Sequence, residues 1–137
     1  MLAPLVDAGR VQLADYCGPD DLWRWYGQAR ALLFPSLHEG FGFPILEAMA
    51  ADLPVLTSDR GAMAEVAGDG ALLVDPEAKG DLVAALHRLA DDQDLRRALV
   101  ARGRGRLDVF RWSETARLTA ETYHRVLAGE TGRGGRR

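Results

Sequence analysis

The stretch from Pro35 to Ala51 constrains this chain most, because it joins an apolar run to a glycine loop and then to the start of a helix. Its sequence is PSLHEGFGFPILEAMAA, and the preceding run, Ala31–Phe34, is short and continuously apolar, as in a buried strand. Gly40 and Gly42 provide a tight loop, and Pro44 stands where the first helical residue is expected, a position that favours proline. A strand, a glycine loop and a helix N-terminus together predict an anion-binding element built from backbone N–H groups.

A carboxylate interrupts the helix that follows the loop. Between Ile45 and Ala51 every residue except Glu47 is apolar, so we expect this helix to be buried on nearly all sides. A carboxylate in such a place needs hydrogen-bond donors, because burying it unpaired is costly. One interpretation places Glu47 in the first helical turn, where it interacts with the helix dipole or the free N–H groups, and the other is that it binds a ligand. The residues alone leave both interpretations open, and Glu39 adds a second carboxylate on the loop side.

The residues from His38 to Ala50 resemble the E-x7-E motif of the retaining GT-B glycosyltransferases of group 1, also called family four. Further matches follow in order along the chain, at Pro35-Ser36, Leu53–Ser58, Ala64–Gly68, Leu73–Pro76 and Arg111–Ser113. The resemblance extends from Arg10 to Leu127. Two glutamates at this spacing are weak evidence by themselves, whereas an ordered series of matches is strong. The chain therefore resembles the C-terminal, donor-binding domain of these enzymes.

The resemblance implies a role for each residue of the motif. It places Glu39 as the catalytic residue, in contact with hydroxyls of the transferred sugar, and Glu47 on the ribose diol of the nucleotide. Two hydroxyl donors would satisfy the Glu47 carboxylate without a countercharge. The substrate-binding set is Glu39, Gly40, Phe41, Gly42, Phe43, Pro44 and Glu47, and the supporting residues are Ser36, His38, Thr57 and Ser58.

The reaction that the resemblance implies moves a sugar from a nucleotide-diphosphate sugar to an acceptor with retention of the anomeric configuration. The departing diphosphate develops negative charge, which the N–H groups of the loop can stabilise. We expect no cofactor besides this donor substrate. We also expect no metal, because no His, Cys and Asp residues have the spacing of metal ligands and the family implies metal independence. The alternative is a non-catalytic module that binds a nucleotide sugar.

A dinucleotide-binding domain of a dehydrogenase does not fit the same loop. Ile45 stands where the G-x-G-x-x-G fingerprint requires its third glycine. Glu47 is also too close to the loop to be the ribose-binding acid, which is expected about 20 residues further on.

Short apolar runs alternate with helical patterns along most of the chain. The expected strands are Val11–Ala14, Ala31–Phe34, Pro54–Thr57 and Ala71–Val74, and the chain becomes wholly helical from Asp81. This pattern predicts an α/β fold with a parallel sheet of about four strands, helices on both faces and a helical C-terminal end. With the resemblance, it predicts a partial Rossmann-like C-terminal domain of a GT-B fold over residues 1–128. Residues 129–137 are rich in Gly and Arg and are expected to form a disordered tail.

Size and composition fit one ordinary domain. The 137 residues carry a net charge of -3, which gives no reason to expect nucleic acid as a partner. The single Cys17 cannot form an internal disulfide and fits a reducing compartment. No apolar run has the length of a membrane span and the N-terminus does not resemble a signal peptide, so we expect a cytoplasmic protein.

Parts of the family pattern have no counterpart in this sequence. The N-terminal domain, which provides most of the acceptor site, and the first strands of the C-terminal domain are not matched. In the family's strand order, 3-2-1-4-5-6, those strands lie beside Ala31–Phe34, which we therefore expect at an exposed apolar edge. We expect a domain truncated at its N-terminal side and inactive in isolation, which pairs with a missing segment, a partner chain or a second copy.

Overall fold

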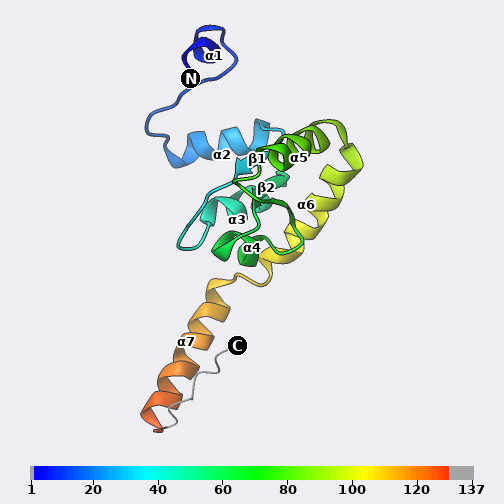
Figure 1. Cartoon of the computed structure of the whole chain (residues 1–137). Coiled ribbons are helices and arrows are strands. Elements are labelled where there is room, and N and C mark those ends of the chain that lie inside the picture. Colours follow the sequence, from blue (N-terminus) through cyan, green and yellow to red (C-terminus); the bar gives the residue numbers. More distant parts are fainter. Residues whose placement is uncertain (1, 130–137) are drawn as a thin grey trace.

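The structure is a computed structural model, and it describes residues 2–129. The elements in chain order are α1 (Ala3–Asp7), α2 (Pro19–Gln28), β1 (Leu32–Phe34), α3 (Phe43–Ala50), β2 (Val55–Ser58), α4 (Gly61–Ala67), β3 (Ala71–Val74), α5 (Lys79–Asp91), α6 (Gln93–Leu107) and α7 (Trp112–Leu127). The strands and helices α2 to α6 form one body, from which α1 and α7 project at opposite ends (Figure 1).

The sheet has three parallel strands in the order β1-β2-β3 within the described residues. Leu32 pairs with Val55, which in turn pairs with Ala71. The prediction of a strand at Val11–Ala14 is wrong: these residues have no regular structure, and the side chain of Leu13 is 68% exposed. The physical reason is that a strand needs a neighbour for its N–H and C=O groups, and no described strand lies beside this segment.

Helices cover both faces of the sheet, as the sequence predicts. On one face the core comes from α3 and α4, with Ile45 and Met63 almost completely buried. On the other face α5 and α6 contribute Leu89 and Leu99. Strand β2 is buried along its whole length, because successive side chains point to opposite faces and both faces are covered. Complete burial of one aliphatic side chain stabilises the fold by about 1.5–3 kcal/mol, so β2 anchors both layers.

Helix α6 approaches the loop before β3 closely, and glycines on both sides allow this. A Cβ atom added to Gly70 would lie 2.9 Å from the Cα atom of Gly103 on α6 and 2.9 Å from Cε of Met49 on α3. Real Cβ atoms do not approach a backbone atom this closely. The contact between α3, α6 and the end of α4 therefore depends on the absence of a side chain at position 70.

We predict that Gly70→Ala destabilises the protein by about 1–3 kcal/mol, because the new methyl group displaces the backbone of α6. The control is Gly105→Ala on α6, where an added Cβ meets nothing within 4 Å. There alanine should raise the free energy of unfolding by up to about 1 kcal/mol, since it favours a helix over glycine. Urea unfolding followed by circular dichroism measures both. Equal stability of the Gly70→Ala variant and the original protein would contradict this packing.

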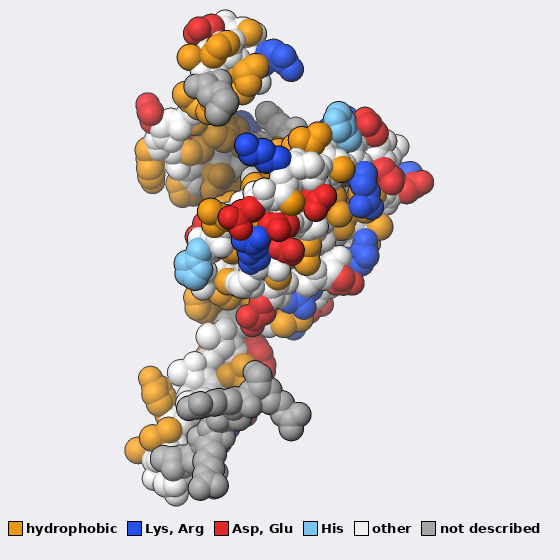
Figure 2. Space-filling model, viewed as in Figure 1, with side chains coloured by type: hydrophobic (Ala, Val, Ile, Leu, Met, Phe, Trp, Pro, Cys, Tyr) orange, Lys and Arg blue, Asp and Glu red, His pale blue; other side chains and the backbone are white. Residues whose placement is uncertain are grey.

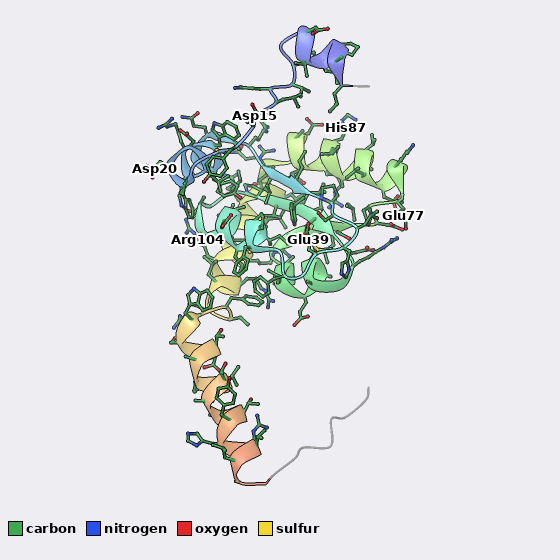
Figure 3. The ribbon with its side chains drawn as sticks, turned by 90° about the vertical axis from the view of Figure 1, so that its left-hand side faces the viewer. Asp15, Asp20, Glu39, Glu77, His87 and Arg104 are labelled. Atoms are coloured by element: carbon green, nitrogen blue, oxygen red, sulfur yellow. The ribbon has the colours of Figure 1, made fainter. Side chains whose placement is uncertain are left out.

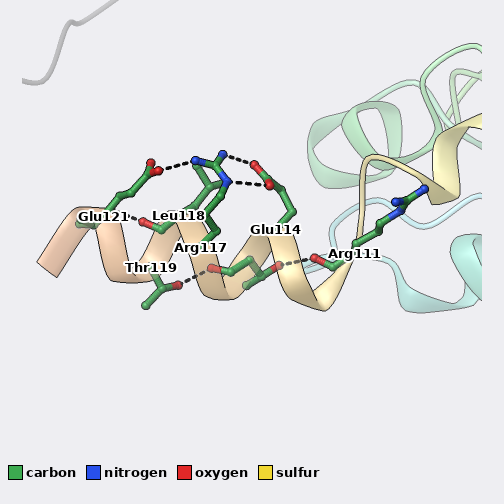
Figure 4. A network of polar contacts seen from close by, with 8 residues as sticks. Arg111, Glu114, Arg117, Leu118, Thr119 and Glu121 are labelled. Atoms are coloured by element: carbon green, nitrogen blue, oxygen red, sulfur yellow. Dashed lines mark hydrogen bonds and ion pairs between the residues drawn. The ribbon is translucent and has the colours of Figure 1, made fainter. Parts of the chain in front are cut away.

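Helix α7 stands away from the body and supports itself by local contacts. The Arg117 guanidinium pairs with Glu114 and Glu121, and the Thr119 hydroxyl donates to the Thr115 carbonyl oxygen at 2.7 Å (Figure 4). Such pairs, three or four residues apart, stabilise a helix without tertiary contacts. None of the residues of α7 is buried, and Figure 2 shows apolar side chains gathered on this helix. The expected helical C-terminal end is confirmed, while residues 130–137 of the expected tail lie outside the described part.

Strand β1 forms one edge of the sheet. It pairs with β2 alone among the described strands, and the side chain of Leu33 is 51% exposed. The sequence predicted this apolar edge. None of the described helices is long and apolar enough to cross a membrane.

Candidate functional site

The loop between β1 and α3 is shaped by Gly42. This residue has φ +101°, in the left-handed region, and its carbonyl oxygen accepts from the N–H of Ile45 at 3.0 Å. Helix α3 begins directly after it, at Phe43. The sequence predicted Pro44 as the first helical residue, but it is the second. No side chain caps this helix, and its first turn contains no acidic residue, so the expected position of Glu47 in the first turn is wrong: the helix starts early enough to put Glu47 in the second turn. The N-terminus of α3 therefore keeps its partial positive charge available to an anion.

We predict that Gly42→Ala destabilises the protein by about 1–2 kcal/mol, the cost of a left-handed backbone for a residue with a side chain. The added Cβ would also lie 3.2 Å from Cδ1 of Ile45. The matched control is Gly40→Ala in the same loop, where an added Cβ meets nothing within 4 Å and φ is not in that region. Thermal unfolding of the two variants compares them directly. Equal losses in both would show that the loop does not depend on Gly42.

Glu39 lies in this loop and is half-buried (Figure 3). Its Oε1 atom accepts a hydrogen bond from the Ser36 hydroxyl at 2.9 Å, which fixes the carboxylate against the start of the loop. Ser36 thus contacts the residue that the sequence analysis expected it to support. His38 and Gly40 are exposed on the same loop.

Glu47 lies on α3, half-buried, and receives a hydrogen bond that the sequence analysis did not foresee. The hydroxyl of Tyr26, on α2, donates to Oε2 of Glu47 at 3.1 Å. Tyr26 is only 8% exposed, and burial, followed by the charge and the hydrogen bond of Glu47, raises its pKa to about 12. A tyrosine on the apolar face of the helix before β1 was the available signal, because a buried phenol needs a partner.

An apolar cavity of about 470 Å³ opens beside Glu47. Phe41 packs against Phe43 and Phe110, with ring centroids 4.7 Å and 5.7 Å apart, so these side chains form one aromatic wall. The complete lining is aromatic or aliphatic apart from Glu47 and Thr115, and consists of Trp23, Phe41, Phe43, Leu46, Glu47, Ala50, Leu107, Phe110, Trp112 and Thr115. A carboxylate at the wall of an apolar cavity suits a ligand that presents both hydroxyl groups and a ring.

Thr57 and Ser58 are fully buried at the end of β2. The Thr57 hydroxyl donates to the Phe34 carbonyl oxygen at 2.8 Å, and Oγ of Ser58 accepts from the N–H of Arg60 at 3.3 Å. Thr57 therefore fixes the last residue of β1, from which the loop starts. Thr57 supports this loop from inside the fold, whereas Ser58 contacts the turn after β2, and neither side chain has surface for a ligand.

The part of the chain that the structure describes contains no group of three or more His, Cys, Asp and Glu side chains arranged to hold a metal ion. The charged groups that follow the C-terminal ends of β2 and β3 are paired with one another: Arg60 contacts Asp75 at 2.6 Å and also pairs with Glu77. These contacts are exposed and contribute little to stability.

The pKa of Tyr26 predicts a change of stability at high pH. Because the folded protein raises this pKa from 10.0 to about 12, the folded state holds the phenolic proton more tightly than the unfolded state. The resulting stability is complete below pH 10 and is lost as the pH rises through about 12. We expect the free energy of unfolding to fall in this window, and to fall less in Tyr26→Phe. Urea titrations on both sides of pH 10 measure the two slopes, and equal slopes would contradict the assignment.

A family model matches most of this chain. The model of the family described as glycosyl transferases group 1 covers residues 8–106, which include Glu39, Glu47 and the whole loop. The chain belongs to the group 1 glycosyltransferases. This confirms the resemblance carried by the E-x7-E motif.

Two curated relatives illustrate the extent of the match. The chain is 34% identical over 115 residues to O-antigen chain mannosyltransferase B of Escherichia coli. The matched region covers 84% of this chain and 30% of that protein. It is 36% identical over 132 residues to the MMP alpha-(1->4)-mannosyltransferase of Mycolicibacterium hassiacum, covering 93% of this chain and 32% of the relative. The chain thus spans about a third of the length of these glycosyltransferases, consistent with their C-terminal domain.

A solved structure shares the fold. Sucrose-phosphate synthase from Thermosynechococcus elongatus superimposes with a TM-score of 0.79 at 27% sequence identity, over 93% of this chain and 33% of that chain. The expected partial Rossmann-like domain of a GT-B fold is therefore confirmed, with three described strands in place of about four.

Proposed function

We propose that this chain is the donor-binding part of a retaining glycosyltransferase and binds a nucleotide-diphosphate sugar at the loop between β1 and α3. The observation that carries the proposal is the half-buried carboxylate of Glu47, which lies at an apolar cavity and one turn after the uncapped N-terminus of α3. Membership of the group 1 family supports the class of donor.

Each part of the donor has a partner in this arrangement. The diphosphate lies against the backbone of the loop and the N-terminus of α3, where the helix dipole favours negative charge. Glu47 accepts hydrogen bonds from the ribose diol. Glu39 accepts from hydroxyls of the transferred sugar, and the Ser36 hydroxyl on its Oε1 atom holds it in one orientation. Pro44 contributes shape but no N–H donor.

The chemistry of transfer divides between this chain and the acceptor site. As the bond from the sugar to the diphosphate breaks, negative charge grows on the departing oxygen, and the fixed dipoles of the loop stabilise it. Glu39 accepts hydrogen bonds from the hydroxyls of the electron-deficient sugar and so holds the sugar in one pose. The similar proteins named mannosyltransferases support a hexose as the transferred sugar. The glycan or small-molecule acceptor binds mainly to residues of the N-terminal domain, which this chain does not match, and no metal is required.

We also propose that the chain does not transfer sugar in isolation. It spans about a third of the length of its relatives, and the apolar edge of β1 has no partner among the described strands. A missing segment, a partner chain or a second copy would cover this edge. The single half-buried Cys17 fits a reducing compartment such as the cytoplasm. The second candidate function is a binding module that holds the nucleotide sugar without transfer.

Calorimetric titration with GDP-mannose, UDP-glucose and ADP-glucose tests the binding site. We predict that one donor binds and that Glu47→Gln weakens it by on the order of 10- to 100-fold, the effect of losing hydrogen bonds to a charged group. The matched control is Glu121→Gln on α7, which removes the same charge from an exposed position and should leave the affinity unchanged.

The titration and an assay for sugar transfer have three outcomes that bear on the proposal. Absence of binding by all three donors, or equal affinity of the Glu47→Gln variant, would overturn the proposal. Release of free sugar or a transferred product by the isolated chain would show that the catalytic parts are complete here. Binding of NADH in place of the donors would support a dinucleotide-binding domain.

A further inference from the structure

Tyr26 is a buried polar residue that the proposed reaction does not use. It is 8% exposed and lies in the core cluster with Ile45 and Ala48. Its hydroxyl is directed at Oε2 of Glu47 at 3.1 Å, across 21 positions of sequence and between two different helices. A core position filled by tyrosine rather than phenylalanine requires a partner for the hydroxyl, and that partner is the carboxylate of the candidate site.

We propose that Tyr26 is a positioning residue that orients the carboxylate of Glu47, so that Oε1 and the remaining lone pair of Oε2 face the ribose of the donor. This inference rests on the proposed role of Glu47 in nucleotide binding. An ionised carboxylate only accepts hydrogen bonds, so the phenol must be the donor in this pair. A fixed hydrogen bond to one oxygen restricts the rotation of the carboxylate before the ligand arrives. Binding then loses less conformational entropy.

A phenol suits this role as the hydrogen-bond partner of Glu47 better than a cationic side chain would. An arginine would bind both carboxylate oxygens and neutralise them, leaving little acceptor capacity for a diol. A phenol occupies one lone pair and leaves the negative charge in place. The Tyr26 hydroxyl also stays protonated far above neutral pH, because its pKa is raised to about 12 by burial and by Glu47.

Helix α2 holds the phenol in place. The ring of Tyr26 packs edge-on against Trp23, with centroids 6.0 Å apart and planes at 79°. Trp23 also lines the cavity beside Glu47, so α2 contributes a wall as well as a hydrogen bond. The nucleotide site therefore includes a helix that precedes the E-x7-E motif.

The test compares ribonucleotides with analogues that lack the diol. Binding of the nucleoside diphosphate of the preferred donor and of its 2′,3′-dideoxy counterpart is measured by calorimetry for the original protein, Tyr26→Phe, Glu47→Gln and the double variant. Tyr26→Phe should weaken the ribonucleotide by about 5- to 10-fold, the effect of one hydrogen bond, and change the dideoxy analogue by less than about two-fold. The double variant should bind no more weakly than Glu47→Gln, because both act through one carboxylate. Tyr123→Phe, which removes an exposed hydroxyl from α7, is the control.

The outcomes separate this inference from the proposed function. If the original protein binds the ribonucleotide through Glu47 but Tyr26→Phe binds it equally well, positioning by Tyr26 is wrong and the proposed function stands. Equal weakening of the ribonucleotide and the dideoxy analogue would show a general structural role for Tyr26 and also overturn positioning. If neither ribonucleotide nor donor binds the original protein, the proposed function fails and this inference fails with it.

A second measurement keeps the inference testable if Tyr26→Phe does not fold. In Glu47→Gln the pKa of Tyr26, measured by NMR of its ring carbons, should fall from about 12 toward the ordinary value of 10.0. An unchanged pKa would show that the two side chains do not interact in solution and would overturn positioning.

Discussion

The carboxylate of Glu47 connects the fold of this protein to its site. A charged oxygen on an otherwise apolar helix requires donors, and the structure supplies one from α2 while leaving the carboxylate half-buried at a cavity. The hydrogen bond from Tyr26 joins α2 to α3, and the Glu47 side chain also lines the cavity. A purely structural glutamate would gain more from complete satisfaction by the protein's own groups. This arrangement supports the proposed role of Glu47 as an acceptor of hydrogen bonds from hydroxyl groups of a ligand.

The sequence predicted the three strands that pair in the sheet. The strand Ala71–Val74 was predicted with its correct bounds, and the strand expected at Pro54–Thr57 lies one residue later, at Val55–Ser58. Burial and local pattern agree best at β2, which is buried along its whole length. The segment Val11–Ala14 has a similar pattern but no neighbouring strand among the described residues, and hydrogen bonding between strands cannot be seen in a local pattern. Helix starts depend on backbone geometry, which explains the shift of Pro44 to the second position of α3.

The candidate site was predictable where it is continuous in sequence and not where it depends on tertiary contacts. Glu39, Gly42 and Glu47 follow from the motif, and the left-handed conformation of Gly42 confirms the need for glycine in the loop. The hydrogen bond from Tyr26 joins residues 21 positions apart, and the helical pattern of α2 indicated only that Tyr26 faces the core. The same holds for Thr57, whose complete burial and bond to the Phe34 carbonyl oxygen arise from the pairing of β1 with β2.

The contacts that support the proposed donor site come from elements that are consecutive in this chain. The helix α2, the strand β1, the glycine loop and α3 follow one another directly, and they are anchored by β2, which is buried from both sides. Helices α1 and α7 project from the body (Figure 1), and the start of α7 contributes Trp112 and Thr115 to the lining of the cavity beside Glu47. In the proposed function, recognition of the nucleotide sugar depends mainly on residues of this body, whereas transfer also requires an acceptor. Binding and transfer would be physically separable in such an arrangement, because the dipoles proposed to stabilise the departing diphosphate belong to α3 itself, while the acceptor is proposed to bind mainly outside this domain.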